Sequence, residues 1–103
     1  MYQGTTPTII WKLPFAASLV KKCTISFRQN GANIDELRKT EANCTLADDT
    51  ISLVLTQEET LLFDPKYNVK IQLKVLTADG VTMATIPEKL RVCEIFDREV
   101  FTT

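Results

Sequence analysis

The side chains that could do chemistry in this sequence are carboxylates, lysines and cysteines, because the chain contains no histidine. Histidine is the commonest general base near neutral pH and the commonest metal ligand. A Ser-His-Asp or Cys-His site therefore cannot be built. Three adjacent acidic pairs are the remaining candidates: Asp35-Glu36, Asp48-Asp49 and Glu58-Glu59. Neighbouring residues on a strand point to opposite faces, and each pair sits where turn or cap residues are expected, so we predict no catalytic site.

Ligand sets for a phosphate, a cofactor or a metal ion are equally weak. The three glycines lie far apart in the sequence, so a glycine-rich phosphate loop cannot form. Asp48, Asp49 and Asp64 could offer oxygen ligands to calcium, but EF-hand spacing is absent and turn positions explain these residues better. We expect no bound cofactor and no metal site.

The three cysteines are an odd number and widely spaced, and no C-x-x-C pair occurs. A zinc site or a disulfide framework needs closer pairing or more ligands, so Cys23, Cys44 and Cys93 are interpreted as reduced thiols. Cys23 alternates with Ile25 and Phe27, which predicts a buried position on a strand.

Trp11, Tyr2 and Tyr67 could form an aromatic platform for a sugar. This pattern supports an alternative function, that of a carbohydrate-binding or adhesin-like module. The alternation of Trp11 with Ile9 and Leu13 instead favours packing of the indole in the core.

Length and charge restrict the class of protein. The 103 residues, 45% of them hydrophobic, suit a single domain over 1–103. Twelve basic and thirteen acidic residues give a net charge of −1, which argues against nucleic acid or an anionic membrane as the main partner. Lys21-Lys22 is interpreted as the solvated start of a strand. The N-terminus lacks the pattern of a signal peptide, and no apolar run approaches the roughly 20 residues that span a bilayer.

Period-two alternation of apolar and polar residues indicates strands along most of the chain. Asn30-Gly31 and Asp79-Gly80 are expected to form hairpin turns. Residues 32–39 are polar enough for an edge strand protected by its charges. The predicted strands cover residues 8–13, 23–29, 32–39, 42–47, 50–55, 68–77, 81–86 and 89–96. We therefore predict an all-β, immunoglobulin-like antiparallel β-sandwich of about seven or eight strands.

One short helix is expected near residues 57–62. Thr56 and Glu59 fit the capping box, in which each side chain accepts a hydrogen bond from the other residue's backbone N–H. Pro65 prevents the helix from continuing. We interpret this segment as a connector between two strands at the end of the sandwich.

Four motifs together resemble a known family: "GTTPT", "ISFRQNG", "LTQEETLLF" and "VKIQLKVLTADGVTMAT". The chain resembles the small prophage proteins of Gram-positive bacteria that are encoded among tail and baseplate genes, over about residues 2–95. Its layout is also similar to the N-terminal β-sandwich domain of phage upper baseplate proteins. It departs from the family pattern at Lys74, where arginine is common, and in the segment "ATIPEKL".

The resemblance implies a non-enzymatic role as a tail or baseplate component or assembly module. The implied partners are other phage tail and baseplate proteins, and the implied location is the host cytoplasm during assembly and then the virion. Residues 97–103 are expected to form a flexible tail. We expect self-association or docking through this tail and through the strand at 8–13, because unpaired sheet edges invite association.

Overall fold

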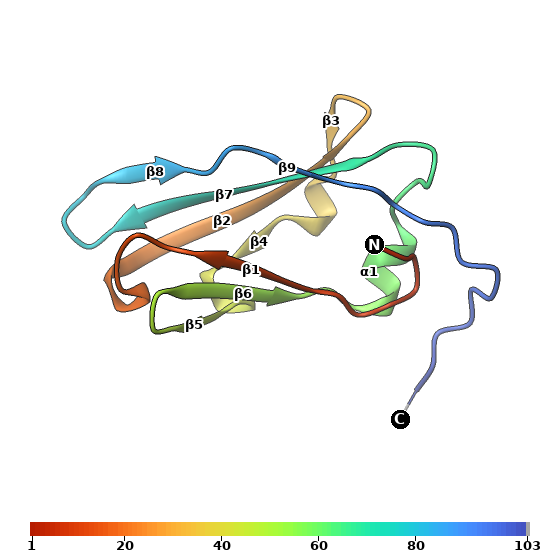
Figure 1. Ribbon diagram of the computed structural model, residues 1–103, viewed down its shortest axis with the longest axis horizontal. Coiled ribbons are helices and arrows are strands. Elements are labelled where there is room, and N and C mark those ends of the chain that lie inside the picture. The colour runs from red at the N-terminus through yellow and green to blue at the C-terminus, as the bar shows by residue number, and fades with distance from the viewer. Residues whose placement is uncertain (103) are drawn as a thin grey trace.

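The computed structural model describes residues 1–102; Thr103, the last residue of the expected tail, lies outside the described part. Within residues 1–102 the chain forms nine strands in two antiparallel sheets (Figure 1). The first sheet has the order β1-β6-β5, and its strands are β1 (Thr8–Lys12), β6 (Thr50–Val54) and β5 (Thr45–Ala47). The second sheet contains β2 (Val20–Gln29), β3 (Ala32–Asn33), β4 (Lys39–Thr40), β7 (Val69–Thr77), β8 (Thr82–Ala84) and β9 (Glu88–Leu90).

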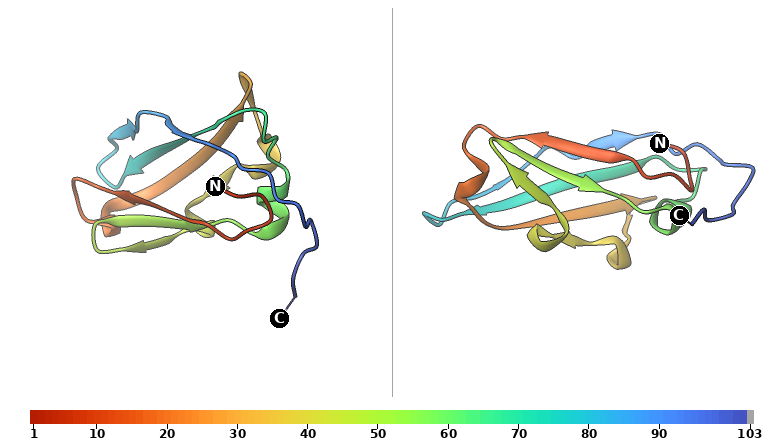
Figure 2. Two further views of the ribbon diagram at one scale, coloured as in Figure 1. Left: turned by 45° about the vertical axis from the view of Figure 1, so that its right-hand side comes forward. Right: turned by 90° about the horizontal axis from the view of Figure 1, so that it is seen from below.

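The two sheets lie as layers with the core between them (Figure 2). In the second sheet β3 and β4 both pair with β2, whereas β8 and β9 both pair with β7. The described strands thus occupy seven positions, three in the first sheet and four in the second. The prediction of a mainly-β, sandwich-like protein with antiparallel sheets is confirmed at this level.

Alternation places the core residues as the sequence indicates. Ile9 and Trp11 of β1 and the following Leu13 are buried, and so are Cys23, Ile25 and Phe27 of β2. Along β7 the buried and exposed positions alternate from Val69 to Val75. Each large apolar side chain that is fully buried stabilises the fold by roughly 1.5–3 kcal/mol, so these three strands supply much of the driving force for folding.

The predicted turn residues occupy two hairpin turns. Asn30 and Gly31 have φ of 50° and 76° and form a two-residue loop between the paired residues Gln29 and Ala32. At the other hairpin Gly80 has φ of 88°, and its N–H donates to the carbonyl of Thr77 at 3.0 Å. A positive φ is easiest for glycine and tolerated by asparagine, which explains the residue types.

The helix α1 (Gln57–Leu61) carries the chain from β6 in the first sheet to β7 in the second (Figure 1). Both hydrogen bonds of the predicted capping box are present. The N–H of Glu59 donates to Thr56 Oγ1 at 3.2 Å, and the N–H of Thr56 donates to Glu59 Oε1 at 2.9 Å. The helix lies where the sequence predicts a connector.

The predicted strand over 32–39 is wrong as a single strand. A 3-10 turn over Asp35–Leu37 separates β3 from β4. Ile34 and Leu37 are three residues apart, so a strand would point them to opposite faces, whereas one tight turn lets both reach the core. Leu37 is accordingly buried, and Ile34 packs against the core cluster.

Three other predicted strands are clearly shorter than expected, and one of them is the strand at 81–86, of which only β8 (Thr82–Ala84) forms. A 3-10 turn over Glu41–Asn43 replaces the start of the strand predicted at 42–47. Only its second half forms a strand, which is β5 (Thr45–Ala47). The strand at 89–96 ends at Leu90, because Leu90 already pairs with Val69, the first residue of β7. Beyond that point Cys93 pairs instead with Tyr2 in an isolated parallel bridge.

A further short 3-10 turn, Ala17–Leu19, leads from the first sheet into β2.

Candidate functional site

The adjacent acidic pairs lie in separate parts of the molecule. Asp35-Glu36 opens the 3-10 turn before β4, Asp48-Asp49 forms the turn between β5 and β6, and Glu58-Glu59 lies in the first turn of α1. Among residues 1–102 no group of three or more His, Cys, Asp or Glu could hold a metal ion. The calcium candidates Asp48, Asp49 and Asp64 are therefore not brought together as a ligand set.

Glu59 has a structural partner in Lys39 of β4. The Nζ of Lys39 donates to Glu59 Oε2, and each side chain is only 17% exposed. Burial of the carboxyl raises its pKa, but the hydrogen bonds from Lys39 and from Thr56 outweigh burial and hold the pKa below its usual range. This ion pair ties α1 to the second sheet.

The cysteine thiols are poor nucleophiles in this fold. Burial, followed by the neighbouring Cys44 and Glu41, raises the pKa of Cys23 to about 12. Burial also raises the pKa of Cys44, whose Sγ donates to the carbonyl of Thr40 at 3.4 Å. Thiolates are the reactive form of cysteine, so neither group is prepared for catalysis. All three cysteines are free, and Cys93 is half-buried.

Trp11 lies in the core with 8% of its surface exposed, as its alternation with Ile9 and Leu13 indicates. Its ring is consequently not available as a sugar platform. Tyr2 and Tyr67 are exposed.

The outer side of the second sheet is the strongest candidate for a binding surface. Arg28 of β2 lies directly opposite Lys70 of β7, and Lys70 lies directly opposite Lys89 of β9. Paired residues point to the same side of a sheet, and like charges directly opposite each other destabilise it. The three cations thus lie in one row, and their mutual repulsion destabilises the fold. An anionic partner would relieve this repulsion, so the row is a candidate binding surface.

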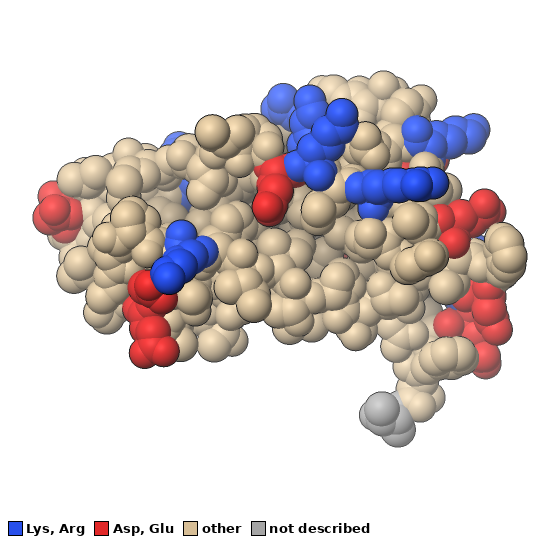
Figure 3. Space-filling model, viewed as in Figure 1, with Lys and Arg blue, Asp and Glu red and all other residues tan. Residues whose placement is uncertain are grey.

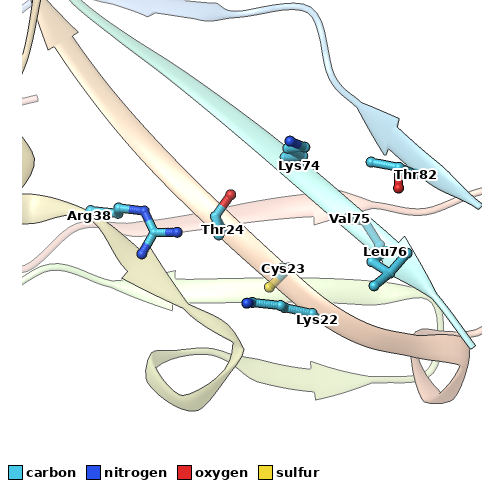
Figure 4. Close-up of a pocket in the computed structure, with 8 residues that line it drawn as sticks. All are labelled: Lys22, Cys23, Thr24, Arg38, Lys74, Val75, Leu76 and Thr82. Atoms are coloured by element: carbon cyan, nitrogen blue, oxygen red, sulfur yellow. The ribbon is translucent and has the colours of Figure 1, made fainter. Parts of the chain in front are cut away.

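A second group of cations lies farther along the same two strands. Lys74 follows Lys70 by four residues, a separation of about 13 Å along a strand. It lines a hollow of about 310 Å³ together with Lys22 and Arg38, with Thr24 between Arg38 and Lys74 (Figure 4). We refer to the six exposed cations on this side as the basic face: Lys22, Arg28, Arg38, Lys70, Lys74 and Lys89.

No cation of the basic face forms an ion pair with an acidic side chain of the described residues. Two more hollows, of about 140 and 310 Å³, surround Arg28 and Lys70, and no Asp or Glu of the described chain lines any of the three. The ion pairs found within residues 1–102 are Lys12 with Asp49 and Lys39 with Glu59, so no cation of the basic face is in one.

Sequence reasoning missed the basic face. The net charge of −1 hides it, because half of the chain's twelve basic residues gather on one side. The outward alternation of Lys70 and Lys74 was a visible signal. The position of Arg28 opposite Lys70 was not visible, because it depends on the pairing of two strands that are forty residues apart in the sequence.

The C-terminal stretch, residues 94–102, is the second exposed feature. Phe96 is 98% exposed and Phe101 is 68% exposed. The stretch lies against α1, since the side-chain amide of Gln57 donates to the carbonyl of Phe101 at 2.9 Å and accepts from its N–H at 2.8 Å. The guanidinium of Arg98 donates to the carbonyl of Leu61 at 3.4 Å.

These contacts collect acidic groups at one end of the molecule. Asp97 and Glu99 flank Arg98, and Glu58 is next to Gln57 in α1. With the exposed Glu94 they form what we refer to as the acidic end: Glu58, Glu94, Asp97 and Glu99. Figure 3 shows acidic side chains along the C-terminal stretch and basic side chains along the upper rim over β9.

Comparisons with known proteins do not assign this chain to a family: no family model matches it, and neither a curated protein nor a solved structure does. Within the described residues no helix is long and apolar enough to cross a membrane.

Proposed function

We propose that this chain is a non-enzymatic structural protein of a phage or prophage, acting as a tail or baseplate component or as an assembly module. The observation that carries the proposal is the C-terminal stretch, which holds two exposed aromatic rings on a backbone fixed to α1. Exposed aromatic side chains on an otherwise well-packed protein are typical of surfaces that other proteins cover.

The sequence motifs support the phage setting, since "GTTPT", "ISFRQNG", "LTQEETLLF" and the β7–β8 hairpin resemble prophage tail-associated proteins. We include an immunoglobulin-like relationship in the proposal. Its support is the sandwich-like arrangement of two antiparallel sheets and the short helix at a corner between them.

The direct test is whether phage particles contain the protein or need it. We would induce the prophage in the source strain, purify the particles and probe them with an antibody raised against this chain. A gene deletion examined by electron microscopy extends the test to a role in assembly alone. The proposal expects either the protein in the particles or defective tails in the deletion strain; particles that lack the protein and keep normal tails would overturn it.

Substitutions in the C-terminal stretch test whether its two exposed aromatic rings are the docking element. The double substitution Phe96→Ala and Phe101→Ala should leave the chain folded but reduce its incorporation at least tenfold. The matched control is Ile86→Ala, which removes another exposed apolar side chain from the segment between β8 and β9. Equal incorporation of both variants would show that the C-terminal stretch is not the docking element.

A further inference from the structure

Within residues 1–102 the cations of the basic face are not engaged in ion pairs. The row Arg28, Lys70 and Lys89 places like charges side by side on three paired strands, and the hollows around it contain no acidic side chain of the described residues. Six exposed cations without ion pairs create a local positive potential that attracts an anionic surface. Within the chain Arg28 donates a hydrogen bond to Asn33 Oδ1 at 2.8 Å, which does not neutralise the charge of the row.

The same chain carries a surface of the opposite sign. The acidic end presents four exposed carboxylates, and Arg98, which lies between two of them in the sequence, directs its guanidinium at the carbonyl of Leu61 and at Gln3. The acidic end lies at the α1 end of the molecule, away from the outer side of the second sheet (Figure 1, Figure 3). The two surfaces therefore cannot meet within one chain.

The net charge of the chain favours a second copy of the chain over a nucleic acid as the partner of the basic face. Proteins that bind nucleic acid through a basic surface usually carry a net positive charge, whereas this chain has a net charge of −1. Unpaired bases stack on rows of aromatic side chains. Among the described residues that line the hollows of the basic face, Tyr67 is a single aromatic side chain, and the uncharged outward positions of β2 and β7 between the cations are Thr24, Ser26 and Gln72. A second copy, in contrast, supplies an acidic surface and keeps the assembly near neutral.

We propose that the basic face of one copy docks onto the acidic end of a second copy of this chain. The contact uses two different surfaces, so each copy can make it twice, once with each surface. Such heterologous contacts continue until a ring closes or a filament grows. The inference goes beyond the proposed function, because it concerns the purified chain and stands or fails independently of whether phage particles contain it.

The test is salt-dependent self-association of the purified full-length protein, measured by sedimentation velocity at high concentration. Salt is varied from about 0.01 M to about 1 M, which shortens the Debye length from about 30 Å to about 3 Å. We expect oligomers at low salt and a monomer at high salt. A monomer throughout, or oligomers that persist unchanged at high salt, would overturn the inference.

Charge reversal identifies the two surfaces. The face variant, Lys70→Glu with Lys89→Glu, and the end variant, Asp97→Lys with Glu99→Lys, should each be monomeric at low salt. Their equimolar mixture should associate again, because each reversed surface then meets its complement on the other variant. The control, Lys12→Glu with Lys66→Glu, makes the same charge change away from the basic face and should associate like the unmodified chain.

Two results would contradict the pairing of these surfaces. In the first, the mixture stays monomeric although both variants are folded by circular dichroism. In the second, the unmodified chain stays monomeric but binds a fluorescent DNA duplex at low salt, and the face variant does not. That second result would assign the basic face to a polyanion instead.

Discussion

Cys23 lies in the middle of β2 with 1% of its surface exposed, and its thiol has a pKa of about 12. Alkylation requires both access and thiolate, and this residue has little of either. We expect a variant that retains only this cysteine, Cys44→Ser with Cys93→Ser, to resist iodoacetamide at pH 8 in the native state. The same variant in denaturant should label fully, which is the internal control. Rapid native labelling would show that the register of β2 is reversed.

Glu59 gives a prediction about pH. Its pKa is lowered in the folded chain, so its ion pair with Lys39 stabilises the fold above the ordinary glutamate pKa of about 4.3. That contribution is lost progressively as the pH falls below this value, because protonation of the carboxyl is easier in the unfolded chain. Glu59→Gln should lower the free energy of unfolding by about 1–3 kcal/mol at pH 7, since it removes the negative charge beside Lys39 and leaves one side-chain oxygen for the two hydrogen bonds from Lys39 and Thr56.

The pH dependence separates the charge effect from a packing effect. Urea unfolding at pH 7 and pH 3 should show a smaller difference between the two proteins at pH 3, because the lowered pKa of Glu59 makes the contribution of its ion pair decline as the pH falls below the pKa of glutamate in the unfolded chain. An equal deficit at both pH values would mean that the ion pair does not account for the loss. The exposed pair Lys12 and Asp49, 3.9 Å apart, serves as a control, because Asp49→Asn should change little.

At the scale of elements, α1 depends on its first turn. Thr56→Ala removes the side chain that accepts from the N–H of Glu59, and an N-cap of this kind contributes about 1 kcal/mol. We expect the midpoint of urea unfolding to fall accordingly, with the m-value unchanged. Thr6→Ala is the control, an exposed threonine in an irregular segment. If Thr56→Ala is as stable as the control but alters docking, α1 is a binding element rather than a connector.

The predicted strands are correct where buried and exposed residues alternate over a long segment. They are wrong where pairing with another strand determines the residue at which the strand ends. β7 is long and alternates strictly, so its sequence alone indicates which side faces the core. The segment at 32–39 offered a usable warning, because the three-residue spacing of Ile34 and Leu37 suits a tight turn. The sequence gives no such sign of where β9 ends, because its last residue is determined by pairing with the first residue of β7.

At the scale of the whole molecule, charge distribution was the property least accessible from sequence. Composition gives only the sum of the charges, and the basic face exists because β2 and β7 are neighbours in one sheet. The acidic end similarly depends on the C-terminal stretch lying against α1. Both surfaces are products of topology, whereas the absence of histidine, which constrains catalysis, could be read directly.

The C-terminal part of the chain should divide into a segment needed for folding and a segment needed for association. Residues 91–93 belong to the fold: Val92 is buried, and Cys93 exchanges backbone hydrogen bonds of 3.0 and 2.7 Å with Gln3 and Met1. Residues 97–102 instead make exposed contacts with Gln57 and Leu61 and one long, part-buried contact of 3.5 Å from Arg98 to Gln3 Oε1. We expect deletion of 91–103 to cost about 3–5 kcal/mol, from one buried side chain and several hydrogen bonds. Deletion of 97–103 should cost less than about 1 kcal/mol.

Urea unfolding and sedimentation of the two truncated chains can be compared directly. The chain that lacks 97–103 should fold like the full-length protein but remain monomeric at low salt, because it has lost Asp97 and Glu99 of the acidic end. This combination separates the two roles, since a general loss of structure would lower stability and association together. If removal of 97–103 unfolds the protein, these residues belong to the core domain; if the shortened chain still associates with the same salt dependence, the acidic end is not the partner of the basic face.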